Sequence, residues 1–172
     1  MCDPKDGAIE NRNPDIRTLS EKKLIGTYRI MSYSQNTTRA LWQSFMPLKK
    51  QIKNAIGSDL YNLQIYTSVN HFNAFNPHSE FTKWAAIEVS DFDCIPDTLA
   101  AYTLKGGLYA VFLHKGLPCK FQKTFDFIFK EWLPKSNYEL DHREHFELLG
   151  DNYSPTDPNS EEEIWIPIQN QK

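Results

Sequence analysis

The stretch that most constrains the fold of this chain covers residues 107–134. Residues 108–113 are apolar on both alternating sides, which is typical of a strand covered on both faces. After a short Gly/Pro turn, apolar side chains recur at the four–three–four spacing of one helix face: Phe121, Phe125, Ile128 and Trp132. The stretch therefore predicts a buried strand, a turn and an amphipathic helix that stops at Pro134.

The first half of the chain repeats this order of elements in a looser form. It predicts a strand at 22–34, a helix at 38–56 that is kinked or broken at Pro47, and strands at 60–67 and 84–92. In the second half, a short strand at 98–104 leads into the opening stretch, and strands at 145–149 and 162–168 follow it. Two strand–helix–strand–strand pseudo-repeats, residues 22–92 and 98–169, are thus expected.

Such a pair of units predicts an α+β fold: an antiparallel sheet with two helices on one face and a central groove. The 172 residues suffice for one domain, which we place at 21–170 after an N-terminal tail at 1–20. Aromatic residues make up 13% of the chain, more than a core of this size requires. That surplus favours an aromatic-lined pocket, although core packing remains the alternative use for most of them.

Several classes of function are disfavoured by charge and composition. A formal net charge of −3 lacks the basic surplus of a general nucleic-acid binder, and no apolar run reaches membrane-spanning length. The segment DHREH at 141–145 matches neither zinc-protease helix motif. Three widely spaced cysteines and no secretion signal favour a reducing cytoplasm. We expect no metal, no cofactor, and no direct nucleic-acid or membrane partner.

Four phrases of the sequence resemble, in the same order, the GyrI-like small-molecule-binding domains: YAVFLHKG at 109–116, EWLPKSNY at 131–138, HFE at 145–147 and EIWIPI at 163–168. The resemblance covers roughly residues 20–169. This domain also forms the effector-binding half of some AraC-type and MerR-type regulators, including multidrug-sensing ones. Because no helix-turn-helix region precedes or follows here, the stand-alone form is expected.

The resemblance implies that the central groove binds small, often cationic or amphipathic molecules. In the similar multidrug sensors a glutamate at the position of Glu147 faces the cationic ligand, so Glu147 is the first candidate for a charge partner. The alternative for Glu147 is an exposed carboxylate on an edge strand. Glu163 is the second candidate, and its alternative is a solvated place in the acidic run 161–163.

Aromatic side chains are the candidates for the pocket walls, through stacking and cation–π contacts. The candidates on strands and helices are Tyr33, Tyr66, Trp84, Tyr109 and Trp132. For each of these, core packing is the competing interpretation. Phe72 and Phe75 are more suggestive, because they lie in a polar loop that has no other evident use for two aromatic rings.

Two other functions are kept open. Some relatives are hydrolases that open strained, electrophilic small molecules with a glutamate and a tyrosine, which suggests Glu147 together with Tyr109 or Tyr66. The family name also comes from inhibition of DNA gyrase, so a gyrase-like protein partner is a third hypothesis. The acidic loop at 151–163 is the feature that suits it.

Overall fold

The computed structural model describes residues 13–72 and 75–172. A nine-stranded antiparallel sheet has the order β1-β6-β9-β8-β3-β4-β2-β5, and β7 pairs with β9 outside this path. The strands are β1 (Asp15–Leu19), β2 (Lys22–Met31), β3 (Ala55–Tyr66), β4 (Phe81–Val89), β5 (Ala100–Leu104), β6 (Gly107–Lys115), β7 (Tyr138–Leu140), β8 (His145–Leu149) and β9 (Glu161–Asn170).

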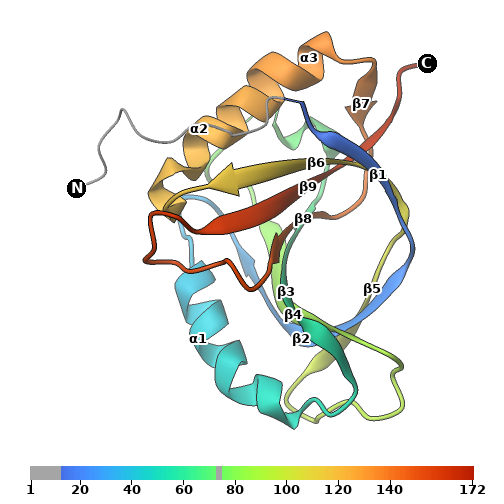
Figure 1. The fold of residues 1–172 in the computed structure, drawn as a ribbon, viewed down its shortest axis with the longest axis vertical. Helices are drawn as coiled ribbons and strands as arrows, with labels where there is room; N and C mark the ends of the chain where they lie inside the picture. The colour runs from blue at the N-terminus through green and yellow to red at the C-terminus, as the bar shows by residue number, and fades with distance from the viewer. Residues whose placement is uncertain (1–12, 73–74) are drawn as a thin grey trace.

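Two helical segments accompany the sheet (Figure 1). The first is α1 (Thr38–Leu48), which continues into a 3₁₀ turn at Lys49–Gln51. The second consists of α2 (Phe121–Asp126), a π-helical stretch at Phe127–Trp132 and α3 (Leu133–Lys135). A 3₁₀ turn at Pro118–Lys120 precedes α2, and another lies at Val69–His71 after β3.

The chain contains the two predicted strand–helix–strand–strand units, β2-α1-β3-β4 and β6-α2-β8-β9. They meet at the pairing of β3 with β8. Across the sheet Ala85 pairs with Asn62, Asn62 with Glu147, and Glu147 with Ile164, so these side chains share one face. Ala85 packs in the cluster under α1 and Ile164 in the cluster under α2. The predicted α+β class with both helices on one face is therefore confirmed.

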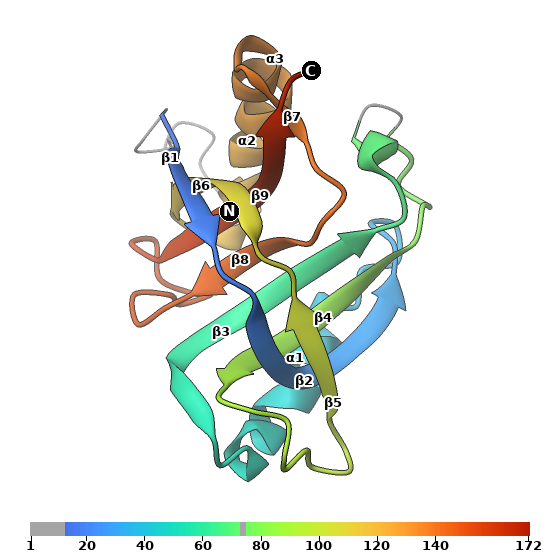
Figure 2. The same cartoon turned by 90° about the vertical axis from the view of Figure 1, so that its right-hand side faces the viewer.

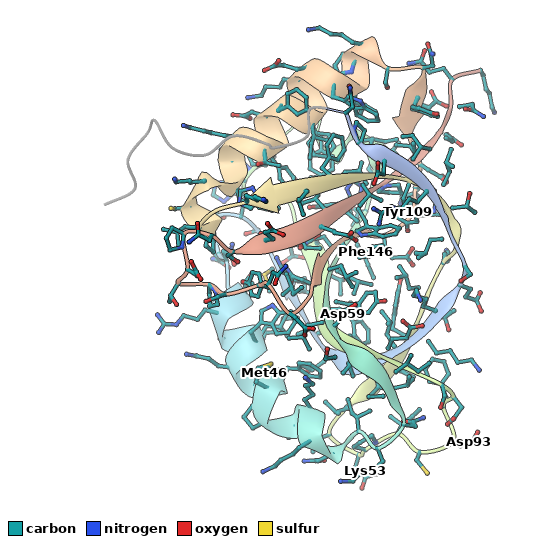
Figure 3. The ribbon with its side chains drawn as sticks, in the orientation of Figure 1. Met46, Lys53, Asp59, Asp93, Tyr109 and Phe146 are labelled. Atoms are coloured by element: carbon teal, nitrogen blue, oxygen red, sulfur yellow. The ribbon has the colours of Figure 1, made fainter. Side chains whose placement is uncertain are left out.

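The other face of the sheet encloses a separate aromatic core. Tyr109 and Phe146, whose ring centroids lie 5.5 Å apart, belong to this core (Figure 3). It is covered by a long bent ladder, in which β1 pairs with β6 and β2 pairs with β5 (Figure 2). The ladder stays in register across the bend, from Leu19↔Gly107 to Lys22↔Leu104. It thereby ties the two units together on the side away from the helices.

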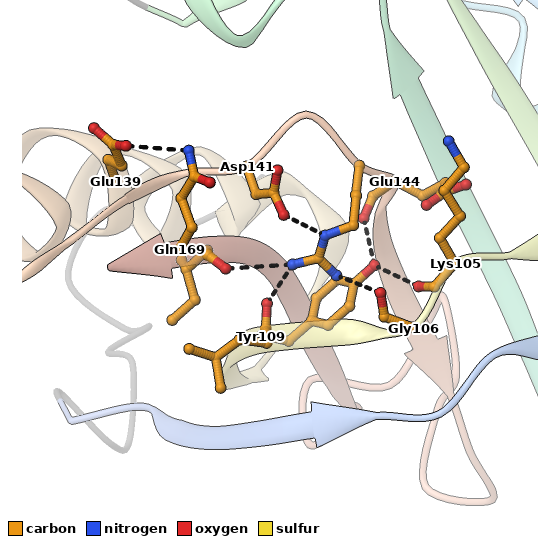
Figure 4. Close-up of polar contacts among 10 residues, drawn as sticks. Lys105, Gly106, Tyr109, Glu139, Asp141, Glu144 and Gln169 are labelled. Atoms are coloured by element: carbon orange, nitrogen blue, oxygen red, sulfur yellow. Dashed lines mark hydrogen bonds and ion pairs between the residues drawn. The ribbon is translucent and has the colours of Figure 1, made fainter. Parts of the chain in front are cut away.

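Arg143, a largely buried arginine, secures the bend of this ladder. Figure 4 shows the polar contacts at the bend, with Gly106, Tyr109 and Asp141 labelled. The Arg143 guanidinium donates to the carbonyl oxygens of Gly106 (3.2 Å), Leu108 (2.6 Å) and Ile168 (3.3 Å). Its Nε donates to Asp141 Oδ2 at 2.6 Å. The guanidinium carbon also lies 4.6 Å from the centroid of the Tyr109 ring. Backbone carbonyl oxygens, one carboxylate and one aromatic ring of the chain thus surround this guanidinium.

Three sequence-based expectations are corrected. The first helix ends at Leu48 instead of residue 56: it runs through Pro47, continues as a 3₁₀ turn to Gln51, and the chain turns extended at Ile52. Residues 15–19, expected within a tail, form β1; most of its side chains are exposed and its pairing is through the main chain, which leaves no apolar pattern. Residues 1–12 lie outside the described part. A strand that was not predicted, β7, follows the second helical segment at Tyr138–Leu140.

Candidate functional site

A cavity of about 420 Å³ opens between the helical segment 121–135 and the central strands. Its aromatic lining consists of Tyr33, Tyr66, Phe72, Phe75, Phe81, Phe121, Phe125 and Phe129. Its polar lining consists of Asn36, Gln64, Lys83, Gln122, Asp126, Lys130 and Glu147. The floor comes from β3, β4 and β8, and the walls come from α2 and from the loops that follow β2 and β3. The predicted central groove is therefore present on the face of the sheet that carries the helices, and residues of α2, but none of α1, line it.

Glu147 is the carboxylate of the cavity floor. Its side chain is 4% exposed, and this burial raises its pKa. The charge of Lys83 and two side-chain hydrogen bonds oppose that rise. Gln64 Nε2 donates to Glu147 Oε2 at 2.9 Å, and Asn62 Nδ2 donates to the same oxygen at 2.7 Å. Since both amides reach Oε2, they hold the carboxylate in one orientation.

The helix α1 acts on this carboxylate without lining the cavity. Trp42 of α1 donates from Nε1 to Asn62 Oδ1 at 3.2 Å. Because the carbonyl oxygen of Asn62 is used in this way, its amide nitrogen is directed at Glu147. Asn62 and Trp42 were not selected from the sequence, because a single Asn on a strand and a Trp on a helix carry no recognisable motif.

Lys83 is the second charged group of the floor, and it was not among the candidates selected from the sequence. It lies on β4 directly opposite Gln64 and lines the same cavity as Glu147. Burial lowers the pKa of Lys83, while the charges of Glu147 and Glu162 raise it. A signal for it exists in the sequence: Phe81, Lys83, Ala85 and Ile87 alternate on one face, and Lys83 is the single charge among them.

Two tyrosines form a hydrogen-bonded pair in the wall. Their hydroxyl oxygens are 2.8 Å apart. Tyr33 follows the end of β2, and Tyr66 is the last residue of β3. Burial is the main cause that raises the pKa of Tyr66, and its neighbour Tyr33 and the charge of Glu147 add to it. Both phenols therefore stay protonated at neutral pH, and each can donate to or accept from a bound molecule.

Phe72 connects the loop after β3 to the helical wall. Its ring stacks on Phe129 with centroids 4.1 Å apart and an interplanar angle of 11°. Phe129 belongs to the π-helical stretch, where the wider turn shifts the faces of the helix. Phe121, Phe125 and Phe129 thus face the cavity, whereas Ile128 packs in the core under the helix.

A buried histidine supports this aromatic wall. His145 contacts Tyr66 edge to face at 5.0 Å and lies 5.2 Å from the Phe72 ring. Burial lowers the pKa of His145 to about 3, and the charges of His71 and Arg143 act in the same direction. The ring is therefore neutral and contributes packing instead of charge near the floor.

The structure brings five of the nine candidate side chains together around the cavity: Glu147, Tyr33, Tyr66, Phe72 and Phe75. It places the other four elsewhere. Trp84 lies on the opposite face against Tyr28 and Tyr102, with ring centroids 4.7 and 5.0 Å away. Because its strand neighbour Lys83 faces the cavity, the alternation of the strand turns Trp84 away.

The remaining three candidates are occupied by structural contacts. Tyr109 donates from its hydroxyl to the carbonyl oxygen of Glu144 at 3.1 Å, so Tyr109 and Glu147 do not form a pair. Trp132 packs edge to face on Phe112 at 5.1 Å. Glu163 accepts hydrogen bonds from Arg17 Nη1 at 3.1 Å and from Trp165 Nε1 at 2.9 Å.

A second, shallower depression of about 270 Å³ lies beside the acidic loop. Asp59, Asp151 and residues 161–163 line it. Burial and the charge of Glu147 raise the pKa of Glu162 to about 8, and Lys83 opposes this rise. Within residues 13–72 and 75–172, no group of three His, Cys, Asp or Glu side chains is arranged to hold a metal ion. No described helix is both long and apolar enough to cross a membrane.

Comparison with known proteins gives a consistent result. A sequence profile of the GyrI-like small molecule binding domain matches residues 12–169. No curated protein sequence matches the chain. Among solved structures, SAV2435 bound to tetraphenylphosphonium is similar with a TM-score of 0.69 at 17% identity, over 91% of this chain and 94% of that chain.

Two further structures share the fold. The C-terminal domain of EcmrR is similar with a TM-score of 0.69 at 11% identity, over 92% of this chain and 98% of that chain. A hydrolase encoded by lin2189 from Listeria innocua is similar with a TM-score of 0.58 at 11% identity, over 92% of each chain. At such identities the likeness concerns the fold.

Proposed function

The chain belongs to the GyrI-like small-molecule-binding domain family, and from this premise we propose that it binds an amphipathic organic molecule with a cationic group in the cavity above Glu147. The observation that carries the proposal is a buried carboxylate on the floor of an aromatic-lined cavity. A binding or sequestering protein needs no more than this arrangement.

Physical chemistry favours a cationic group at Glu147. An ionised carboxylate that is removed from water is destabilised unless a positive charge or several donors compensate it. Two amide donors already hold Oε2, which leaves the second carboxylate oxygen to a ligand. The surrounding rings add stacking and cation–π contacts of about 0.5–2 kcal/mol each.

The ligand of a structural neighbour supports the same chemical class. SAV2435 was solved with tetraphenylphosphonium, a cation whose charge is surrounded by four phenyl rings. Aromatic rings and a negative charge are the groups that complement such a molecule. Tyr33, Tyr66, Phe72 and Phe129 supply the rings here, and Glu147 supplies the charge.

The test is calorimetric titration with tetraphenylphosphonium and with the neutral triphenylphosphine oxide. We expect Glu147→Gln to weaken binding of the cation at least tenfold and binding of the neutral compound less than twofold. Glu163→Gln is the matched control, because Glu163 is paired with Arg17 outside the cavity and should alter neither affinity. Equal losses for the two compounds in Glu147→Gln would contradict the role of Glu147.

A second candidate function is hydrolysis, because Glu147 and Tyr66 line the same cavity. The raised pKa of Glu147 suits a general base that activates water, and a tyrosine hydroxyl suits a donor to the leaving oxygen. Opening of styrene oxide to its diol is a direct assay. Turnover lost in both Glu147→Gln and Tyr66→Phe would support this function, and no turnover by the wild-type protein would exclude it for this substrate class.

A further inference from the structure

The floor of the cavity contains a positive charge as well as a negative one. Lys83 on β4 and Glu147 on β8 flank the strand β3, where Lys83 lies opposite Gln64 and Glu147 lies opposite Asn62, two residues along the same face. Gln64 pairs across the sheet with Lys83 and donates its amide to Glu147. The ammonium and the carboxylate are therefore neighbours on one face, and both line the cavity.

Lys83 differs from the other lysine of the cavity. Lys130, on the helical wall, makes an ion pair with Asp126 at 2.8 Å, and its side chain is 73% exposed. Lys83 is half-buried, and within residues 13–72 and 75–172 its ammonium makes no hydrogen bond. A half-buried ammonium that donates to no protein group keeps its N–H donors for an acceptor on a bound molecule.

This arrangement changes what the cavity recognises. A ligand that carries only a positive charge meets a carboxylate already partly compensated by Lys83, and it also meets the repulsion of that ammonium. A ligand that carries both charges satisfies both groups. Its cationic part then lies against Glu147 and the rings, and its anionic part accepts hydrogen bonds from Lys83.

We propose that the ligand of this cavity is an aromatic zwitterion, whose carboxylate or similar anionic group binds Lys83 while its cationic group faces Glu147. The inference rests on the proposed function, since it assigns a second recognition group within the same cavity. Lys83 is thereby the residue that determines specificity between cationic and zwitterionic molecules.

Two dyes that differ in one group test this inference. Tetramethylrhodamine carries a cationic ring system and a free carboxylate, and its methyl ester keeps the ring system but loses the negative charge. Binding is followed by fluorescence anisotropy at pH 7.5 for wild-type protein, Lys83→Met and Lys22→Met. Methionine keeps the length of the lysine stem and removes its charge.

We expect the wild-type protein to bind the acid at least tenfold more tightly than the ester. Lys83→Met should reverse this order, because loss of the ammonium weakens the acid and strengthens the ester. Lys22→Met is the matched control: Lys22 of β2 pairs with Glu88 of β4 at 2.8 Å, outside the cavity, so the ratio should stay as in the wild-type protein.

The outcomes separate this inference from the proposed function. If the wild-type protein prefers the ester, or if Lys83→Met leaves the ratio unchanged, Lys83 does not receive an anionic group and the inference fails. Tetraphenylphosphonium, measured in parallel, reports on the proposed function. Should it bind while the acid shows no preference, the cation-binding function stands alone; should none of the three compounds bind, both proposals fail.

Discussion

Two partly buried cations in this fold have opposite surroundings. Arg143, at the bend of the β1–β2/β5–β6 ladder, donates to three backbone carbonyl oxygens and to Asp141, and its guanidinium stacks on Tyr109. Lys83, on the floor of the cavity, faces Glu147 and Glu162 only through electrostatic attraction. Arg143 therefore has hydrogen-bond acceptors within the chain, whereas Lys83 has nearby negative charges but no hydrogen-bond acceptor among the described residues.

On our proposal, the difference separates a structural charge from a binding charge. The acceptors of Arg143 belong to the backbone of the folded chain, so its hydrogen bonds are present with or without a ligand and contribute to stability. The charges of Lys83 and Glu147 face a space of about 420 Å³, where a bound molecule can complete them. Stability should therefore depend on Arg143, and ligand selection should depend on Lys83 and Glu147.

The largest expected effect breaks the structural cluster. Arg143→Met removes four hydrogen bonds and leaves three carbonyl oxygens and Asp141 without their donor. We expect the free energy of unfolding, measured in urea, to fall by about 3–5 kcal/mol. Lys83→Met should change it by less than about 1 kcal/mol, because an apolar side chain replaces a poorly paired charge. Similar losses in both variants would remove the distinction.

A glycine next to Arg143 sharpens the comparison. Gly107 has a φ of +140°, and a Cβ there would come within 2.6 Å of the guanidinium carbon. Gly107→Ala should therefore lower the free energy of unfolding by about 2–3 kcal/mol. Gly57 is the control, with a φ of +72° and open space around it. Gly57→Ala should cost about 1 kcal/mol, from backbone strain alone. Thermal unfolding of both variants measures the difference.

A smaller effect concerns pH on the cavity side. The pKa of Glu162 is raised to about 8, above its value of 4.5 in an unfolded chain, so its contribution to stability is lost as pH rises from about 4.5 to 8. Glu162→Gln removes this dependence. At pH 8 the variant should be more stable than the wild-type protein by about 1 kcal/mol, after allowance for solvent screening. At pH 4 the two should unfold alike; a variant less stable at pH 8 would show that Glu162 is needed in its charged form.

Hydrophobic patterns predicted most of the strands and helices. Alternation at β4 and the spacing of apolar residues on α2 depend on local periodicity, which a sequence displays directly. The pattern failed where structure depends on backbone pairing: β1 is an edge strand with mostly exposed side chains, and it is ordered by its ladder with β6. The end of α1 was overestimated because apolar spacing continued past Pro47 into residues that form β3.

The site was foreseen only in part, since sequence does not say which face of a strand the helices cover. The alternation of side chains along the strand of Trp84 was predicted correctly. Which of its two faces lies under the helices depends on the packing of β4 with β2, β3 and the helices. The predicted strand began at residue 84, whereas β4 begins at Phe81 and includes Lys83. Glu147 came from the family resemblance, whereas its supports Asn62 and Gln64 required the register of β3 against β8.

The most direct test of the account is the free energy of unfolding of the double variant Lys83→Met/Glu147→Gln without ligand. If both charges serve binding, the variant should be as stable as the wild-type protein within about 1 kcal/mol, or more stable, while it no longer selects tetramethylrhodamine over its methyl ester. A loss of about 3 kcal/mol or more, as expected for Arg143→Met, would show that the floor of the cavity is a structural ion pair.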